Sequence, residues 1–411
     1  MMDASSAAAL AARNAYGRLL AYLAVRTRDV SAAEDALGDA FLQALTTWPN
    51  RGVPTNPEAW LLVIARRRLI DGARRTQTQA KALKLLDLDG FESASTAELM
   101  TFPDERLKLL FVCAHPAIDA KLHTPLMLQT ILGLNAAQIG SAFLVPPTTM
   151  GQRLVRVKAK IRDAGIPFEL PSGVNLAERS HAVLQAIYAA YNADWTAANG
   201  SDCKQLGLSQ EAMWLAELCA QLMPDEPEAY GLLALIRYCE SRRSARKTPE
   251  GRYVPLLEQD TTLWSRKLIS EAELALKQAA SYQCLGGFQL EAAIQSIHAQ
   301  RLHTGHVDWK QLSQLYAGLI QIAPTVGAHV GYVAVIAHTQ SAAKALVQLN
   351  SIQDKGLQTY QPYWAVKADL LKQVGEIEKA KQAYSQAIGL SEDPAVRAFL
   401  SEKSLELVNQ R

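Results

Sequence analysis

The stretch that decides the fold runs from Leu134 to Arg162 and has the sequence LNAAQIGSAFLVPPTTMGQRLVRVKAKIR. It predicts two short helices joined by a tight turn, because Asn135 is a good N-cap residue and Pro147 suits the first turn of a second helix. In that second helix, apolar residues at helical spacing predict a buried stripe. The members of the stripe are Met150, Leu154, Val157 and Ile161. The remaining faces are basic, so the stretch predicts a helix-turn-helix that enters the DNA major groove. The alternative is a solvated basic helix on a bundle.

The composition extends the helical prediction to the whole chain. The 411 residues are rich in Ala, Leu, Gln, Glu and Lys, and apolar alternation with a period of two is scarce, so we expect an all-α protein of two or three domains. The five cysteines are odd in number and widely spaced, which favours buried thiols in a reducing cytoplasm over disulfides. Neither a signal peptide nor a membrane span is predicted, so we expect a cytoplasmic protein without a membrane partner.

Charge is distributed unevenly along the chain. The net charge is only +2. Residues 1–165, however, contain 20 Lys and Arg against 15 Asp and Glu, whereas the rest contains 22 against 25. A basic front and a mildly acidic back indicate nucleic acid as the partner of the first part and something else for the second.

Residues 10–75 are predicted to form a compact helical domain. One helix covers about 11–27, and Ser31 is expected to cap a second. Asn56 and Pro57 begin a third helix, PEAWLLVIARRRLIDGARR, with five arginines next to Trp60. Such a cluster is typical of a surface that follows phosphates beside a stacking side chain. The alternatives are that the arginines are merely solvated and that the tryptophan belongs to the core.

The order of these segments resembles a known family. AEDALGDAFLQAL is similar to the helix that bacterial RNA polymerase sigma factors of the extracytoplasmic-function group, within the sigma-70 family, dock on the polymerase. AWLLVIARRRLIDGARR is similar to the segment with which these factors open and read the −10 promoter element. Residues 134–162 are similar to the domain with which they read the −35 element. PDERLKLLFVCAHPAI and LLEQDTTLWSRKLI resemble a subgroup with a C-terminal helical-repeat extension. The resemblance covers about residues 16–400.

The resemblance implies a domain plan and candidate residues. It implies a region 2-like domain at 10–75, a linker at 76–101, a region 4-like helix-turn-helix domain at 102–168 and a repeat domain at 172–411. In the second helix of the helix-turn-helix, the first turns are placed to contact bases, and the later basic residues are placed to contact phosphates. The −35 candidates are Thr148, Thr149, Gln152, Arg153, Arg156, Lys158 and Lys160. The −10 candidates are Arg66, Arg67, Asp71, Arg74 and Arg75, with Arg51 and Asn56 at a pocket for an unstacked base. The polymerase-binding candidates are Glu34, Asp35, Asp39, Phe41 and Leu42, with a core position open for Phe41.

Repeat spacing in the back half predicts a tetratricopeptide-like array of helix pairs. Residues 361–394 follow the 34-residue pattern, with only the closing proline displaced. The matching residues are Trp364, Ala368, Leu371, Ala380, Tyr384 and Ala387. Such arrays present a concave face to a peptide or protein. The alternative is that the array only stabilises the front domains.

No catalytic motif is evident, and we expect neither enzymatic activity nor a cofactor or metal. The cysteine and histidines at 113, 115 and 123 lack a zinc spacing, and no Gly-rich phosphate loop occurs. The main hypothesis is a sigma factor that binds core RNA polymerase and promoter DNA and initiates transcription, with a regulatory or partner-binding repeat domain. The alternative hypotheses are a stand-alone helix-turn-helix activator with a tetratricopeptide sensor and a repeat scaffold with incidental basic helices.

Overall fold

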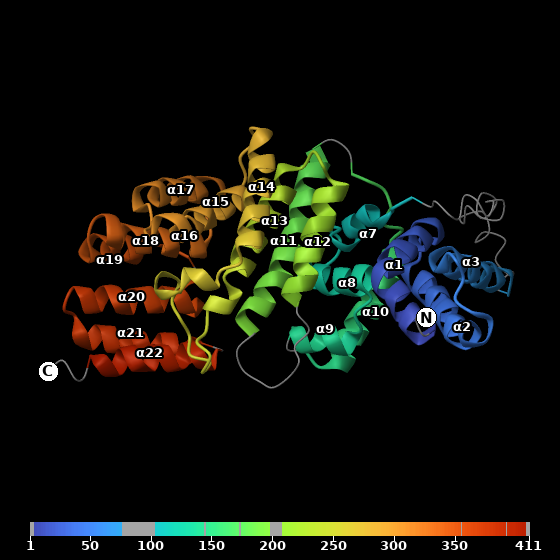
Figure 1. Cartoon of the computed structure of the whole chain (residues 1–411), viewed down its shortest axis with the longest axis horizontal. Helices are drawn as coiled ribbons and strands as arrows, with labels where there is room; N and C mark the ends of the chain where they lie inside the picture. The colour runs from blue at the N-terminus through green and yellow to red at the C-terminus, as the bar shows by residue number, and fades with distance from the viewer. Residues whose placement is uncertain are drawn as a thin grey trace. The chain divides into compact units, whose positions relative to one another are not determined.

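Figure 1 shows a computed structural model of the chain, in which residues 4–75, 103–143, 145–171, 174–197, 208–354, 356–391 and 393–407 are described. Over these ranges the chain forms helices and no strand, apart from one isolated bridge between Lys247 and Tyr253. The all-α prediction is therefore confirmed. The expected linker at 76–101 lies outside the described residues. No helix in the described ranges has both the length and the apolar character needed to cross a lipid bilayer.

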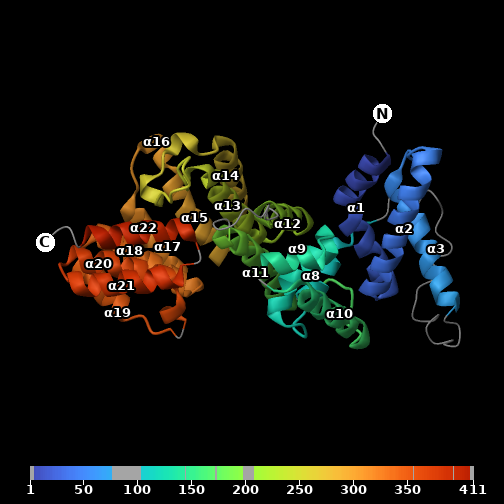
Figure 2. The ribbon, with the colours of Figure 1, turned by 90° about the horizontal axis from the view of Figure 1, so that it is seen from below.

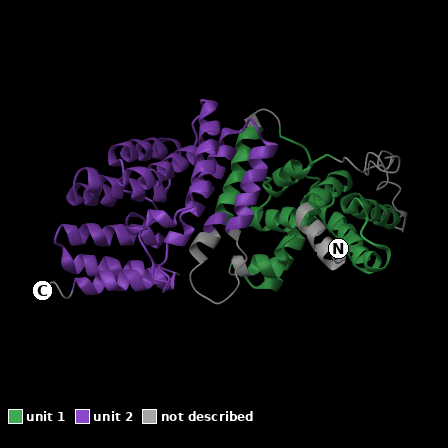
Figure 3. Ribbon diagram, in the orientation of Figure 1, with its two compact units in different colours: residues 1–190 green, residues 191–411 purple. Residues whose placement is uncertain are grey.

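The chain divides into two compact units, residues 1–190 and 191–411 (Figure 3). The boundary falls within one helix, α11 (Val174–Ala197). In unit 1, the hydroxyl of Thr124 donates to the backbone carbonyl of Ala186 at 2.7 Å. The guanidinium of Arg179 donates to the carbonyl of Phe111. The first part of α11 is therefore tied to unit 1 by hydrogen bonds.

Three helices open unit 1: α1 (Ala4–Thr27), α2 (Val30–Arg51) and α3 (Pro57–Arg75). The side chain of Asp29, not Ser31 as expected, caps α2 by accepting the N–H of Ala32. Asp29 lies two residues earlier, so the helix starts at Val30 and Ser31 is inside it. The apolar faces of the three helices meet in a core that includes Leu19, Leu23, Leu37, Ala40, Leu61 and Leu62.

Four further helices follow in unit 1: α7 (Arg106–Cys113), α8 (Ala120–Leu132), α9 (Ala136–Ala142) and α10 (Pro147–Asp163). The Asn135 side chain accepts the N–H groups of Ala137 and Gln138, and Gln138 in turn accepts the N–H of Asn135. This reciprocal pair is a capping box. Pro147 occupies the first turn of α10, and the predicted stripe from Met150 to Ile161 is buried. The caps and the stripe predicted for this stretch are confirmed.

Helix α1 packs on both α7 and α8, so the three N-terminal helices and the next four share one body. The contact is tightest at Gly17, where a side-chain Cβ would lie 2.1 Å from the carbonyl oxygen of Ile131. Gly133, which ends α8 in the left-handed region with φ 71°, is close to the ring of Tyr16. Glycine at position 17 is therefore required for the close approach of α1 and α8.

Unit 2 consists of successive helices that pack on their neighbours in sequence (Figures 1 and 2). They are α12 (Leu208–Leu222), α13 (Pro227–Ser241), α14 (Arg266–Ser281), α15 (Gly287–Ala299), α16 (Arg301–Thr304), α17 (Trp309–Ile322), α18 (Val326–Thr339), α19 (Ala342–Asn350), α20 (Gln361–Gln373), α21 (Ile377–Leu390) and α22 (Pro394–Glu406). The closest helix pairs are α13 with α14 and α15, α17 with α18, and α20 with α21.

Small and large residues alternate in the α20–α21 pair. Ala368, Ala380 and Ala387 are fully buried where the helices cross, and Leu371 and Tyr384 fill the space between them. Trp364 packs against the same cluster. These six residues are those at the positions predicted from the 34-residue pattern.

Candidate nucleic-acid and polymerase interface

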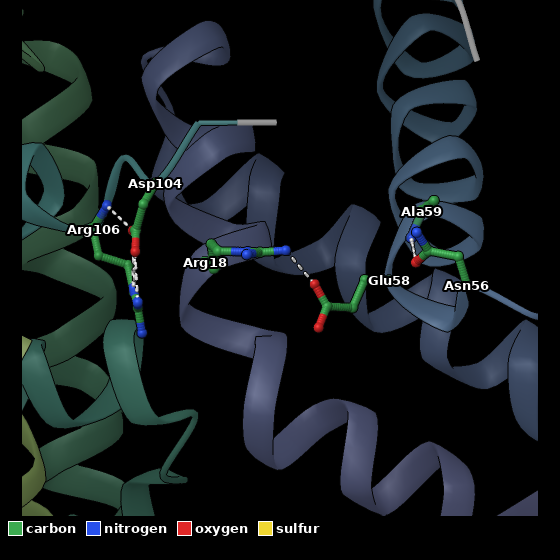
Figure 4. Close-up of polar contacts among 6 residues, drawn as sticks. All are labelled: Arg18, Asn56, Glu58, Ala59, Asp104 and Arg106. Carbon is green, nitrogen blue, oxygen red and sulfur yellow. Dashed lines mark hydrogen bonds and ion pairs between the residues drawn. The ribbon is translucent and has the colours of Figure 1, made fainter. Parts of the chain in front are cut away.

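The start of α3 is fixed by a side-chain cap and an ion pair. Asn56 accepts the N–H of Ala59 at 3.0 Å, and Glu58 pairs with Arg18 of α1 (Figure 4). A second local pair, Asp104 with Arg106, holds the chain just before α7 (Figure 4). Partial burial raises the pKa of the Asp104 carboxyl, but the four hydrogen bonds that it accepts from Arg106 lower it further, so the pKa lies below its usual value. The Asn56 side chain therefore caps α3 as predicted, which ties the side chain that was also expected at a base pocket to the start of the helix.

The arginines of α3 do not share one environment. Arg67 and Arg68 are exposed, and Arg68 lies 3.7 Å from the carboxylate of Asp39 on α2. Arg66 is buried, with 8% of its surface exposed, and this contradicts its predicted place on an exposed phosphate track. It follows Leu62 by four residues and Ala65 by one, so it falls on the packed face of α3. Asp71 is exposed, and the side chains of Arg74 and Arg75 lie outside the described part of the structure.

A cleft with a volume of about 660 Å³ lies where the end of α2, the following loop and α3 meet. Its lining combines aromatic, polar and cationic groups. The lining residues are Gln43, Thr46, Thr47, Trp48, Asn50, Arg51, Gly52, Val53, Pro54, Trp60, Ile64 and Arg67. Trp48 is buried and meets Trp60 edge to face, with ring centroids 5.5 Å apart. Arg51, predicted at a pocket, lines this cleft, whereas Asn56 does not.

The exposed face of α10 carries most of the −35 candidates. Thr148, Gln152, Arg153 and Arg156 are exposed, and Thr149 is half-buried. Lys160 is exposed and donates to the carbonyl of Ala117 at 2.5 Å. The turn before α10 is closed by a hydrogen bond from the Val145 N–H to the Gly140 carbonyl at 2.8 Å. A Cβ at Gly140 would lie 2.6 Å from the Val145 oxygen, so the turn geometry depends on glycine.

Lys158 is placed differently from its neighbours on α10. Its side chain is only 7% exposed and pairs with Glu34 of α2, whose side chain is 15% exposed. This contradicts the predicted role of Lys158 as a solvent-facing phosphate contact in this conformation, and it covers Glu34, a predicted polymerase contact. The physical reason is that α10 packs on α2, at a separation of 124 residues in sequence.

Burial dominates the electrostatics around Glu34. It raises the pKa of the Glu34 carboxyl, and the smaller effect of Lys158 lowers it. The pKa of the Cys113 thiol is raised to about 12, first by burial, and that of Tyr16 is also raised by burial and by the Glu34 charge. The ion pair thus lies in a site of low polarity rather than on a solvated surface.

The other polymerase-binding candidates lie along the outer side of α2. Asp35 and Asp39 are exposed, and Leu42 is 64% exposed. Phe41 is half-buried, so it lies neither wholly on the exposed polymerase-binding surface nor wholly in the core, the two positions expected for it. No group of three or more His, Cys, Asp or Glu that would hold a metal occurs among the described residues.

Comparison with known proteins identifies the first of these domains. Residues 13–79 match the family model for sigma-70 region 2, and this range includes the cleft and the exposed face of α2. Residues 179–280 match a family of unknown function, DUF6596. The chain is 36% identical over 392 residues to an uncharacterized protein of Rhizobium meliloti (strain 1021), with 94% of this chain and 91% of that protein covered. The chain belongs to the same family as that protein. No solved structure matches.

The region 2 match supports a sigma-70 family factor with a role in transcription initiation. It does not favour the alternative of a stand-alone activator, because such a protein needs no polymerase-docking domain. Proteins of the sigma-70 family are transcription factors rather than enzymes, and region 2 implies core RNA polymerase and promoter DNA as partners.

Sequence reasoning missed two features of this family member. Trp48 was expected only as the first residue of a pocket-forming loop, and its edge-to-face contact with Trp60 was missed. The contact between α2 and α10 was also missed. Its members, Glu34 and Lys158, were assigned to separate surfaces, and no local pattern connects them.

Proposed function

We propose that the chain is a sigma factor of the extracytoplasmic-function group that directs promoter-specific transcription initiation. The observation that carries the proposal is the coincidence of the sigma-70 region 2 match with a cleft lined by tryptophan and arginine. In this proposal, residues 10–75 form the region 2-like domain, 76–101 the linker, 102–168 the region 4-like domain and 172–411 a regulatory domain.

The cleft has the chemistry needed to hold an unstacked base of the −10 element. Promoter opening requires that a base leaves the helical stack, and aromatic faces and guanidinium planes take up such bases. Trp60 supplies the aromatic surface, supported by Trp48 in the core. Arg51 and Arg67 place positive charge at the lining, where the phosphates of the opened strand carry the opposite charge. Arg68 and Asp71 extend this surface along α3.

Helix α10 is proposed to enter the major groove at the −35 element as the second helix of a helix-turn-helix. Exposed residues on its first three turns carry the donors and acceptors that base edges require. These are Thr148, Gln152, Arg153 and Arg156. Lys160 lies further along, where contacts with phosphates fix the register of the helix on the duplex.

The outer side of α2 is proposed to bind the polymerase. Asp35 and Asp39 supply charge, and Leu42 supplies apolar area that is otherwise exposed to solvent. An exposed leucine flanked by acids favours a protein partner with a basic rim around an apolar centre. Glu34 belongs to the same helix but is covered by α10.

Unit 2 is proposed to be a divergent tetratricopeptide-like array that binds a peptide or protein. The support is the burial of Ala368, Ala380 and Ala387 at the crossing of α20 and α21, as the repeat pattern requires. In this proposal, unit 2 acts on transcription through α11, because this helix begins in unit 1 and ends in unit 2.

A reconstituted transcription assay tests the proposal. Core polymerase from the source organism is mixed with the full chain and a library of genomic fragments, and the 5′ ends of transcripts are sequenced. We expect a discrete set of start sites that share −10 and −35 sequences and vanish without the chain. An activator would yield no transcript until another sigma factor is added. Arg67→Ala should weaken these transcripts, whereas Lys121→Ala, an exposed cation outside the cleft and α10, should not.

A further inference from the structure

We propose that unit 2 carries a binding site for a phosphate group, formed by Arg242 directly after α13, His298 of α15 and Arg301 of α16. All three residues belong to the same compact unit, and the site requires neither polymerase nor DNA. The inference therefore goes beyond the proposed function and is tested separately from it.

Positive charge is concentrated where α13 ends and the segment that leads to α14 begins (Figure 1). Residues 191–411 contain 21 Lys and Arg against 23 Asp and Glu, so unit 2 as a whole is slightly acidic. Residues 242–252 nevertheless contain five of these cations and a single acid, Glu250. A local basic cluster in an acidic unit favours a small anionic group as the ligand over a general attraction to nucleic acid.

The segment between α13 and α14 is anchored at both of its sides. The N–H of Ser265 donates to the carbonyl of Ser241 at 2.7 Å, which closes the segment at its base. The guanidinium of Arg301 donates to the carbonyls of Leu256 and Leu257 at 2.7 and 2.9 Å. These bonds bring the basic end of α13 and the start of α16 to the same folded segment.

Two guanidinium groups of this cluster have neutral partners. Arg242 donates to the side-chain oxygen of Gln295 on α15 at 2.5 Å and to the sulfur of Cys239 at 3.6 Å. Arg301 donates to backbone carbonyls. Within the part of the chain that the structure describes, neither guanidinium forms an ion pair, so no carboxylate of that part balances the two charges directly.

His298 is close enough to both arginines to respond to their charges. It is only 8% exposed, and its Nδ1 atom has no hydrogen-bond partner among the described residues. Burial, with smaller effects from Arg242 and Arg301, lowers the pKa of His298 to about 4. The guanidinium of Arg301 also lies over the ring of Trp264, 5.5 Å from its centroid, and the buried Nε1 of this ring likewise has no described partner. Buried polar atoms without partners cost free energy, so two of them beside one cation point to a ligand.

The acids nearest to the cluster are engaged elsewhere. Glu240 pairs with Arg243 at 2.7 Å. Glu291 lies on α15 and acts on Tyr316, whose pKa is raised first by burial and then by the Glu291 charge. It is not among the charges that shift the pKa of His298. An external anion is therefore the group that fits between the two arginines.

A phosphate group has the charge and the acceptors that this arrangement requires. A phosphate monoester carries about −1.5 to −2 charges near neutral pH and offers three strong acceptor oxygens. Guanidinium groups bind such oxygens in pairs, and the half-buried Arg242 and Arg301 each use only two of their five N–H groups on described residues. The Nδ1 atom of His298 supplies a further donor. A carboxylate has a single charge and two oxygens, so it would satisfy fewer of these donors.

Calorimetric titration of the full chain in a phosphate-free buffer tests the site. The probes are inorganic phosphate, phosphoserine and a peptide that contains one phosphoserine, and the controls are the unphosphorylated peptide and chloride at equal ionic strength. We expect saturable binding at one site for the phosphate probes alone. Tighter binding of the phosphopeptide than of phosphoserine would assign the phosphate to a partner protein, and equal binding would assign it to a small metabolite. The inference is overturned if no phosphate probe binds saturably or if the controls bind equally well.

Two charge-removing variants locate the site. Arg242→Gln removes a guanidinium whose partners are side chains only, so the backbone keeps its hydrogen bonds. We expect phosphate affinity to fall at least about tenfold, as for the loss of a charge-assisted hydrogen bond. Arg252→Gln is the matched control, because it removes the same charge from an exposed position of the same segment and should leave the affinity unchanged. Equal losses in the two variants would show a diffuse charge effect and contradict a site at Arg242.

Nuclear magnetic resonance of the unaltered chain with ¹⁵N-labelled histidine provides a second measurement that needs no folded variant at Arg242. The signal of His298 is identified by its absence in His298→Asn. Saturating phosphate should shift this signal and leave that of the exposed His338 in place. Phosphate that binds without any shift at His298 would exclude the proposed location.

Discussion

The rings of Trp48 and Trp60 meet edge to face, with centroids 5.5 Å apart and planes inclined by 63°. Trp48 is buried in the core of the first three helices, whereas Trp60 is half-buried and lines the cleft. Trp48 therefore fixes the orientation of a second ring that remains accessible to a ligand. Under the proposed function, such a pair would hold the stacking surface in place before a base binds, which lowers the entropic cost of binding.

Trp60→Ala should weaken promoter opening. Stacking of a base on an aromatic ring contributes about 1–3 kcal/mol, so we expect roughly a 5- to 150-fold loss in the yield of open complexes. Permanganate reactivity of unpaired thymines measures this directly. Trp60→Phe should retain much of the activity, and Trp309→Phe in unit 2 should have no effect. Full opening by the alanine variant would exclude Trp60 as a stacking surface.

Arg153→Ala and Arg156→Ala should each lower initiation at promoters with a −35 element. Each bidentate base contact contributes about 1–3 kcal/mol, so the expected loss is roughly 5- to 150-fold and should depend on the base at one position. Lys160→Ala should instead weaken binding of all sequences alike and lower the salt dependence by about one phosphate contact. Run-off transcription over a set of −35 variants and salt concentrations separates the two outcomes. Equal effects on every −35 sequence would contradict base recognition by the arginines.

Gly17→Ala should loosen the contact between α1 and α8. The added methyl group would meet the Ile131 carbonyl, and overpacking of this kind costs about 1–3 kcal/mol. Gly38→Ala on α2 is the matched control, because nothing lies within 4 Å of its Cβ position and alanine favours a helix by about 1 kcal/mol. Hydrogen–deuterium exchange of the α1 and α8 peptides is the measurement. Faster exchange is expected for Gly17→Ala alone, and unchanged protection would show that the backbones are further apart than described.

Acid should destabilise unit 2 through His298. Burial, with help from Arg242 and Arg301, lowers the pKa of His298 from 6.5 to about 4. A folded-state pKa below the unfolded value means that the unfolded chain binds the proton more tightly. The stability contributed by the neutral ring is therefore present above about pH 6.5 and is lost as the pH falls towards 4. The effect is at most about 3 kcal/mol.

Urea unfolding of the full chain between pH 7 and pH 4, followed by exchange of the α15 peptide, measures this loss. His298→Asn should flatten the pH dependence, and His303→Asn, at an exposed position in α16, should leave it unchanged. A wild-type profile without a decline in this range would contradict burial of a neutral His298.

Local signals in the sequence predicted local structure well. The caps at Asn56 and Asn135, the start of α10 at Pro147 and the stripe from Met150 to Ile161 all depend on residues within a few positions of one another. Arg51, expected at a pocket for an unstacked base, lines the cleft, and its contact with a base stays a prediction.

The errors have two different physical origins. The helical phase of α3 already put Arg66 on the side of Leu62 and Ala65, so closer attention to periodicity would have predicted its burial. The helical phase of α10 also puts Lys158 beside the buried stripe, because it follows Leu154 by four residues and precedes Ile161 by three, but its ion pair with Glu34 was not predictable in this way. What covers Lys158 is a helix more than a hundred residues earlier in the chain. A charge pattern in the sequence shows which charges a helix carries. Which other helix packs against those charges depends on the tertiary structure.

The closed turn between Gly140 and Val145 has a practical consequence. The angle between α9 and α10 is held by a backbone hydrogen bond and a missing side chain, and not by the residues that point outward from α10. Combinatorial libraries that vary positions 148, 152 and 153 can therefore be built without disturbing the scaffold. Under the proposed function, such libraries would vary promoter recognition while position 140 stays glycine.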